Sequence, residues 1–294
     1  MIKMKVKISL FALVVLLTGM KSDNPAYLVF GKEGKPAKYK NIVEDAAKAD
    51  IVFFGEQHNN PISHWLELEI TKDLFAEKGT GIVAGAEMFE TDDQLVIDEY
   101  LSGAIAQKNF EKEVKLWDNY STDYKPLMEF AKEKKFAFIA TNIPRRYSSL
   151  VNKKGFEVLD SLSAEAKRLM MPLPVNYDPE LKSYKAMLEM NEGEMPGGAH
   201  ATENLPKAQA VKDATMAYSI LQHWQPGKTF IHYNGSYHSD NYEGIVWHLK
   251  QQKPDMKILT ISTVEQDTIG DLKEEFMNLA DYIICVPTGM TKTY

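Results

Sequence analysis

The chain has 294 residues, of which 44% are hydrophobic, and a formal net charge of -7. This length and composition are enough for one large domain with a substantial core. The sequence shows no cluster of lysine and arginine, so it argues against a nucleic acid partner, because phosphate binding depends on such clusters.

The first residues are typical of an export signal. Lysines at positions 3, 5 and 7 precede the apolar run Ile8 to Leu17, which at about ten residues is too short for a permanent membrane helix. We therefore expect a signal peptide over residues 1–22 and one exported domain over 23–294, periplasmic or associated with the cell envelope. An uncleaved anchor is the alternative. Met20 stands where a bacterial lipoprotein signal needs cysteine, which argues against a lipid anchor and leaves membrane association open.

Short apolar segments rich in β-branched and aromatic residues predict strands. They are Tyr27–Phe30, Ile51–Phe54, Gly81–Ala86, Phe136–Ala140, Thr229–Tyr233, Lys257–Ser262 and Tyr282–Val286. Helical patterns lie between most of them: one begins at Pro61, and others cover roughly Asp92–Leu101, Asp123–Lys134, Glu203–Trp224 and Tyr242–Lys250. This alternation predicts an α/β fold, with a central, largely parallel sheet and helices on both faces.

The pattern changes between about residues 161 and 203, where prolines, a glycine pair and methionines at 170, 171, 187, 190 and 195 interrupt it. We interpret this segment as an inserted helical subdomain. It is either a helical insertion packed on the core, or a lid or partner surface whose flexible thioether side chains suit a large apolar ligand.

Chemistry-bearing residues follow three of the predicted strands. Glu56 and His58 come just after one strand, Glu87 ends the next, and His238 follows a third. Because the carboxyl ends of parallel strands meet at one edge of a sheet, we expect these four side chains to share a site. Each also has a structural alternative: a lone histidine often packs and hydrogen bonds, and a buried glutamate often forms a salt bridge to a helix.

The charge state of these groups depends on their surroundings. A carboxylate such as Glu56 orients or charges a neighbouring imidazole, and burial raises the pKa of Glu87 unless a cation or donor is near. His238 is expected at a helix N-terminus, whose dipole keeps the ring neutral. We expect His232 to pack inside, and His223 and His248 to lie at the surface or at helix C-caps.

Further candidates lie at the fourth strand end and in the long helix. Arg145 is suited to hold an anion such as a propionate, or else pairs with a local acid. Gln209 and Asp213 share one helix face, which either borders a polar cavity or turns into solvent, and His200 stands just upstream. The single cysteine, Cys285, lies in an apolar strand and excludes a cysteine metal cluster and an intrachain disulfide.

These motifs together resemble the ChaN-like haem-binding lipoproteins, within a wider group that includes Tiki-type metalloproteases and erythromycin esterase-like enzymes. The resemblance runs from about residue 45 to 262 and is carried by Phe54-Gly-Glu-Gln-His-Asn-Asn-Pro61, Ala86-Glu-Met-Phe89, Asp93-Gln94, Tyr100-Leu-Ser-Gly103, Asn142-Ile-Pro-Arg145, Gln209, Asp213, Met216-Ala217 and Gly235-Ser-Tyr-His238. It implies export, a role in bacterial iron or haem acquisition, and a homodimer when haem is bound.

Three hypotheses follow. The first is a non-catalytic binder of non-covalent haem, in which a tyrosine or histidine ligates the iron and His58, Arg145, His200 and His238 contribute to the site. The second is a metal-dependent hydrolase, in which His58, Glu87 and His238 hold a divalent ion and Glu56 or Glu87 acts as general base. The third is a partner-binding module. The residue chemistry favours the second, and the resemblance favours the first.

Overall fold

The computed structural model describes residues 24–189 and 203–294. In this part of the chain the centre is an eight-stranded sheet in the order β2-β1-β8-β7-β3-β6-β4-β5. The expected signal peptide over residues 1–22 and the end of the predicted insertion lie outside the described residues.

The predicted strands are present, with bounds that differ by a few residues. They are β1 (Leu28–Gly31), β3 (Ile51–Glu56), β4 (Ile82–Glu90), β5 (Phe138–Asn142), β6 (Thr229–Gly235), β7 (Ile258–Gln266) and β8 (Tyr282–Pro287). From β8 to β5 all neighbours are parallel, whereas β1 is antiparallel to β8 and to the short strand β2 (Pro36–Ala37), which was not predicted. The prediction of a largely parallel sheet is confirmed.

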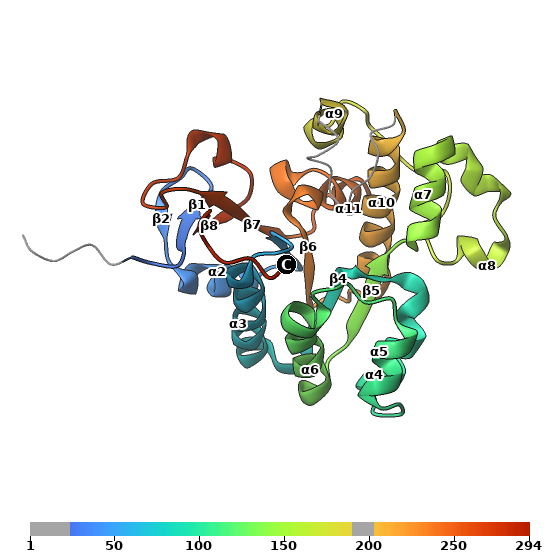
Figure 1. Cartoon of the computed structure of the whole chain (residues 1–294), viewed down its shortest axis with the longest axis horizontal. Coiled ribbons are helices and arrows are strands. Elements are labelled where there is room, and N and C mark those ends of the chain that lie inside the picture. Colours follow the sequence, from blue (N-terminus) through green and yellow to red (C-terminus); the bar gives the residue numbers. More distant parts are fainter. Residues whose placement is uncertain (1–23, 190–202) are drawn as a thin grey trace, which may run out of the picture.

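Helices cover both faces of this sheet. They are α2 (Tyr39–Ala46), α3 (Pro61–Lys78), α4 (Gln94–Leu101), α5 (Gln107–Glu113), α6 (Lys125–Lys134), α7 (Arg145–Lys154), α8 (Ala164–Lys167), α9 (Lys182–Glu189), α10 (Leu205–His223) and α11 (Ile245–Gln252). In Figure 1, α3, α4, α5 and α6 lie below the sheet, and α9, α10 and α11 lie above it. Within the described ranges, no helix combines the length and the apolar character needed to span a lipid bilayer.

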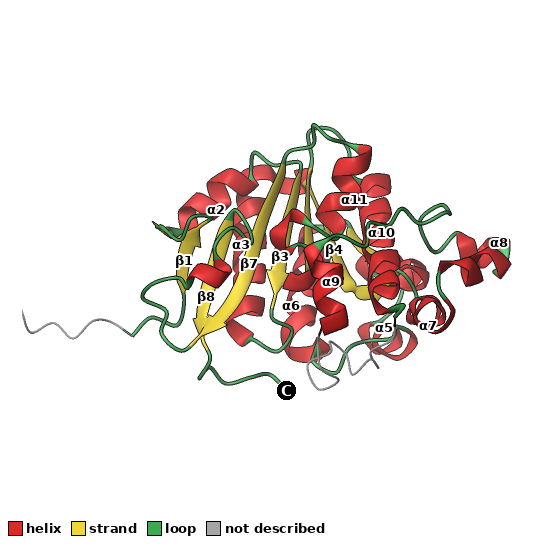
Figure 2. Cartoon of the chain, turned by 90° about the horizontal axis from the view of Figure 1, so that it is seen from above, coloured by secondary structure: helices red, strands yellow, loops and turns green. Residues whose placement is uncertain are grey.

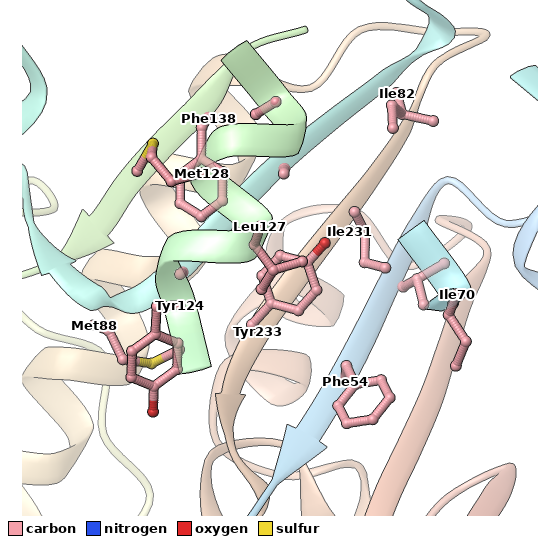
Figure 3. Close-up of a cluster of buried hydrophobic side chains, with 14 of the residues drawn as sticks. Phe54, Ile70, Ile82, Met88, Tyr124, Leu127, Met128, Phe138, Ile231 and Tyr233 are labelled. Atoms are coloured by element: carbon pink, nitrogen blue, oxygen red, sulfur yellow. The ribbon is translucent and has the colours of Figure 1, made fainter. Parts of the chain in front are cut away.

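The alternation of side chains along β3 supplies both cores. Val52 and Phe54 point to the face covered by α3 and α6, whereas Ile51 and Phe53 point to the face covered by α10 and α11, as the period of two along a strand requires. Figure 3 shows part of the first core, where Phe54 and Ile70 lie on the two sides of one interface. A fully apolar strand of this kind is typical of a parallel sheet that is buried on both faces.

The predicted insertion packs on the core through the part that is described. Met170 and Met171 are buried in a third hydrophobic cluster together with residues of α7 and α10, and Met187 in α9 is buried as well. These three methionines therefore fill core space, as expected for a packed insertion and not for an open lid. Met190 and Met195 lie outside the described residues.

Helix α3 begins where the sequence predicts, and its start fixes the loop that carries His58. The Asn60 side chain accepts hydrogen bonds from the backbone N–H groups of Ile62 and Ser63, and Pro61 occupies the first turn. This is the usual arrangement of an N-cap. The loop between Glu56 and α3 is therefore short and anchored at both ends.

Candidate functional site

Three strand ends bring the predicted side chains together. β3 ends at Glu56, and its neighbour across the ladder is Gly235 at the end of β6. β4 pairs with β6 on the other side, and its Glu87 Oε2 accepts a hydrogen bond from the Gly235 N–H at 2.9 Å. Glu56, Glu87, and the loops that carry His58 and His238 therefore meet at one edge of the sheet, as expected from the sequence.

His58 and Glu56 form a hydrogen-bonded pair. His58 Nδ1 lies 2.6 Å from Glu56 Oε1, which also accepts a hydrogen bond from the Tyr124 hydroxyl at 2.7 Å. Because an ionised carboxylate only accepts, Nδ1 carries a proton and Glu56 fixes the orientation of the ring. The His58 side chain is 30% exposed and that of Glu56 is 0% exposed, so His58 is the member of the pair that a ligand can reach.

Gly235 leaves room for the His58 ring. A Cβ atom at this position would lie 2.7 Å from His58 Nε2 and 3.6 Å from Glu87 Oε2. The first distance is shorter than any ordinary non-bonded contact, so a larger residue would displace the ring. Glycine at this strand end therefore allows His58 and Glu87 to approach the same stretch of backbone.

His238 lies between two carboxylates in the interior. Its Nε2 is 3.0 Å from Glu87 Oε1, and its Nδ1 contacts Asp213 Oδ1. Asp213 Oδ2 in turn accepts a hydrogen bond from the Tyr184 hydroxyl at 2.8 Å, and the amide of Gln209 lies 3.0 Å from His238 Nε2. The polar part of the α10 face, Gln209 and Asp213, is thus directed at His238 and not at solvent.

The two carboxylates determine the charge of His238. Burial lowers the pKa of His238, but the charges of Glu87 and Asp213 outweigh burial and raise the pKa to about 9. Burial also raises the pKa of Glu87, and here the charge of His238 outweighs it and holds the pKa well below its usual value. The prediction of a neutral His238 ring is therefore wrong.

The error comes from the expected helix and from a distant acid. His238 ends a three-residue 3-10 turn, Ser236–His238, and α11 starts only at Ile245. Such a short turn has little dipole, while Asp213 approaches from α10, 25 residues away in sequence. A carboxylate from another element thus replaces the helix N-terminus as the controlling charge.

A second polar group, missed by the sequence reasoning, lies behind Glu56. His64 Nδ1 is 3.5 Å from Glu56 Oε2 and 3.2 Å from Glu67 Oε2, and all three side chains are buried. Burial lowers the pKa of His64, but the charges of Glu56 and Glu67 outweigh it and raise the pKa to about 10. A signal for this group exists in the sequence: Ser63, Glu67 and Thr71 recur every four residues beside the apolar stripe of α3.

A short π turn, Tyr120–Tyr124, completes this group. It directs Tyr124 at Glu56, and it places Asp123 Oδ2 3.4 Å from His64 Nε2. Asn119, just before the turn, donates to Asp123 Oδ2 at 2.7 Å and to the His58 carbonyl at 2.9 Å. Irregular helical turns of this type are frequent at functional sites, because they redirect side chains that a regular helix would spread around its axis.

Arg145, a further predicted binding residue, lies apart from the cluster. Arg145 is exposed at the start of α7, and none of the ion pairs between described residues involves it. The next residue, Arg146, pairs with Asp92 at 2.6 Å, an acid 54 residues away in sequence. β5 lies three places from β3 in the sheet, about 14 Å at the usual strand spacing. His200 lies outside the described residues.

The other histidines and the cysteine have structural environments. His232 is buried, and its ring contacts the Thr141 hydroxyl at 2.7 Å, so the expectation of a packed histidine is confirmed. His223 is exposed as expected. His248 is buried, so its predicted surface position is wrong, because α11 is itself packed against α10. Cys285 is a free cysteine in the core.

Of the predicted metal ligands, His58 and Glu87 lie against Gly235, and His238 contacts Glu87. His238 uses both ring nitrogens for carboxylate contacts. In the described part of the chain, the one set of three potential ligands whose atoms all lie within 4.8 Å of one another consists of Glu56, His64 and Glu67.

The fold and the cluster define an α/β protein that carries paired histidines and carboxylates at the carboxyl edge of a parallel sheet. The family model described as haem-binding uptake, Tiki superfamily, ChaN matches residues 42–249. The chain belongs to this haem-binding family.

The chain is also similar to solved structures. ChaN of Campylobacter jejuni, described as binding haem cofacially, has 16% identity and a TM-score of 0.63, over 89% of this chain and 97% of that chain. The type III effector HopBA1 has 14% identity and a TM-score of 0.47, over 90% and 99%. RRSP, a MARTX toxin effector domain from Vibrio vulnificus, has 15% identity and a TM-score of 0.45, over 77% and 36%. The comparison with curated protein sequences finds no match.

Proposed function

We propose that this protein is an exported, non-covalent haem-binding protein that serves haem or iron uptake. The observation that carries the proposal is the match of residues 42–249 to a family described as haem-binding uptake. The similar Campylobacter jejuni protein is described as binding haem cofacially, and this supports the same ligand class here.

The exposed fractions of His58 and His238 indicate where a haem would lie. His238 is 4% exposed, and both of its ring nitrogens are engaged by carboxylates, so an iron atom has no path to it. His58 is accessible, and Trp117 packs edge-on against it with 4.9 Å between ring centroids. A haem held by this cluster therefore lies over the strand ends, at the surface, with His58 as the nearest imidazole.

Tyr294 is a second candidate for the iron ligand. It is 65% exposed, and the preceding residue, Thr293, donates its N–H to the Asn59 carbonyl at 3.0 Å, next to His58. Figure 2 shows this end of the chain beside the carboxyl ends of the strands. Burial and then the charge of Glu56 raise the pKa of its phenol, so the phenol and the cluster are close enough to interact. Tyrosine and histidine are both established axial ligands of haem iron.

Arg145 is the candidate for a propionate. A guanidinium binds a carboxylate bidentately, and Arg145 is exposed three strands away from His58. A small metabolite is too short to contact the ends of both β3 and β5. Haem, a macrocycle with propionate arms, is a much wider ligand. A haem that lies on the surface leaves one of its faces open. A second copy of the protein with its own haem would cover that face, so we also propose a homodimer when haem is bound.

The test is a titration with haemin, followed by the Soret band and by the mass of the complex in solution. We expect a tight, saturable shift and dimer formation in the wild type. His58→Ala or Tyr294→Phe should change the Soret position, and Arg145→Ala should weaken binding by about ten-fold, as expected for one lost charge-assisted contact. His223→Ala and Arg146→Ala are the controls, since His223 is an exposed histidine on α10 and Arg146 is already paired with Asp92. A featureless wild-type titration would contradict the proposal.

A metal-dependent hydrolase is the second candidate. The observation that favours it is the pairing of His58 with buried Glu56 at 2.6 Å, because a carboxylate that holds the Nδ1–H of an imidazole orients its other nitrogen for a metal ion. Glu87 lies close by, on the other side of Gly235. In this case His58→Ala abolishes metal-dependent hydrolysis of ester or peptide substrates, and haemin gives no saturable shift.

Export is tested separately. Expression of the full chain in a bacterium, followed by fractionation, should place the protein in the periplasmic or envelope fraction without its first residues. Recovery of the uncleaved chain from the cytoplasm would contradict export.

A further inference from the structure

Behind Glu56, three buried side chains direct their ligand atoms at one another. Glu56 comes from the end of β3, and His64 and Glu67 come from the first two turns of α3. Their exposed fractions are 1%, 5% and 0%, and one ligand atom from each lies within 4.8 Å of the other two. This group is separate from the His238 group, which lies beyond His58 and Gly235.

The spacing of these atoms is compatible with shared coordination as well as with long hydrogen bonds. His64 Nδ1 lies 3.5 Å from Glu56 Oε2 and 3.2 Å from Glu67 Oε2. A charge-assisted hydrogen bond between such groups is shorter, about 2.7–2.9 Å. Two ligands of one tetrahedral zinc ion, with bonds of about 2.0–2.2 Å, are separated by about 3.4 Å. The observed distances lie around this value.

Two buried oxygens of this group have no N–H or hydroxyl donor. They are Glu56 Oε2 and Glu67 Oε1, neither of which receives a hydrogen bond from such a donor among the described residues, and burial together with the charge of Glu56 raises the pKa of Glu67 well above its usual value. A buried acceptor without a partner costs about 1–3 kcal/mol, and more when it is charged. Carboxylate oxygens only accept, so the group that satisfies both of them has to be positively charged or has to donate.

The surroundings of His64 are those of a metal ligand. Its Nε2 lies 3.1 Å from the His58 carbonyl and 3.4 Å from Asp123 Oδ2, and Asn119 binds both of these acceptors. An imidazole that ligates a metal through one nitrogen usually donates its other N–H to a carbonyl or carboxylate, which fixes the tautomer. In His64 a bound metal ion would replace the Nδ1 proton, and the Nδ1 lone pair would then be directed at an ion held between the two glutamates.

We propose that Glu56, His64 and Glu67 form a structural site for one divalent transition-metal ion with the coordination preferences of Zn²⁺. The two carboxylates and the neutral imidazole carry two negative charges that such an ion neutralises, and nitrogen and oxygen ligands suit it. The ion ties the end of β3 to α3. Because Glu56 Oε1 holds His58 Nδ1, it also fixes the position of the accessible histidine.

The competing arrangement is a proton in place of the ion. If Glu67 is protonated and donates to Glu56, the group is complete without metal. The two arrangements differ in a measurable way, because only the first takes up one equivalent of Zn²⁺ or Co²⁺.

The experiment uses the full chain, unfolded in urea with a chelator and refolded with Zn²⁺ or Co²⁺ alone. We expect about one equivalent of bound metal, a higher melting temperature with Zn²⁺, and visible absorption bands of tetrahedral Co²⁺. Glu67→Gln and His64→Gln should weaken metal binding at least ten-fold, and Glu87→Gln, the same change at a buried glutamate outside the group, should bind one equivalent.

Two results would overturn the site. One is a folded wild type that takes up no metal and shows no Co²⁺ bands, which would establish the shared proton. The other is metal lost in Glu87→Gln and kept in Glu67→Gln, which would place the ion at His58, Glu87 and His238. If Glu67→Gln does not fold, the Co²⁺ spectrum of the wild type and metal binding by the His64→Gln variant decide whether the site exists. The haemin titration is a separate measurement with its own readout, so failure here leaves the proposed function to its own test.

Discussion

The ion pairs of His238 predict a loss of stability in alkaline solution. Folding raises the pKa of His238 from its usual 6.5 to about 9. A group whose pKa is raised in the folded state contributes stability that is complete below pH 6.5 and is lost as the pH rises through 9. Each pH unit between these two values corresponds to about 1.4 kcal/mol, so His238 contributes about 3 kcal/mol. The paired depression of the Glu87 pKa reports the same interaction and is not added.

Two measurements check this prediction. Urea unfolding of the wild type between pH 6 and pH 10 should show a free energy of unfolding that falls by about 3 kcal/mol above pH 6.5 through this group. Proton NMR, with the His238 resonance assigned from a His238→Gln variant, should show a ring that titrates near pH 9. A His238 ring that titrates near 6.5, or a stability that is flat from pH 6.5 to 9, would refute the reasoning.

Two kinds of substitution test the local geometry. Asn60→Ala removes the cap of α3 and should lower the free energy of unfolding by about 1 kcal/mol in urea denaturation. A Cβ at Gly55 would meet backbone atoms at 2.9 and 3.0 Å, whereas at Gly235 its closest contacts, at 2.7 and 2.8 Å, are with the His58 ring. Gly55→Ala should therefore cost about 1–3 kcal/mol, while Gly235→Ala should mainly displace His58 and shift its NMR titration.

The outcomes that contradict these predictions are distinct. Equal stability losses in the two glycine variants would show that the His58 ring does not move away from a Cβ at position 235. An unchanged His58 titration in Gly235→Ala would show that the ring does not lie against Gly235. An unchanged urea midpoint in Asn60→Ala would show that the cap contributes nothing.

The parallel sheet could be predicted because its strands are apolar on both faces. Segments such as Ile51–Phe54 have no alternation of polar and apolar residues, and this is typical of strands covered by helices on both sides. β2 was missed because it has only two residues, one of them Pro36, and exists only through its pairing with β1. Local propensity carries no signal for such a short edge strand.

The convergence of Glu56, His58, Glu87 and His238 could be predicted because the parallel strands of a sheet all end at the same edge, whatever their order in the sheet. The charge of His238 could not, because it depends on Asp213, which α10 brings from a distant part of the sequence.

The second polar group was missed for a related reason. His64 and Glu67 lie on the buried side of α3, and single-sequence reasoning assigns polar residues of a helix to its exposed side. Only the three-dimensional position of Glu56 shows what they contact.

The most direct test of the central claim, that haem binds over the strand ends at His58, is one paired haemin titration. The wild type should show a saturable Soret shift, and the double variant His58→Ala/Tyr294→Phe should lose that shift while its circular dichroism and unfolding midpoint stay close to the wild type. The same saturable shift in both proteins, or no shift in the wild type, would contradict the account.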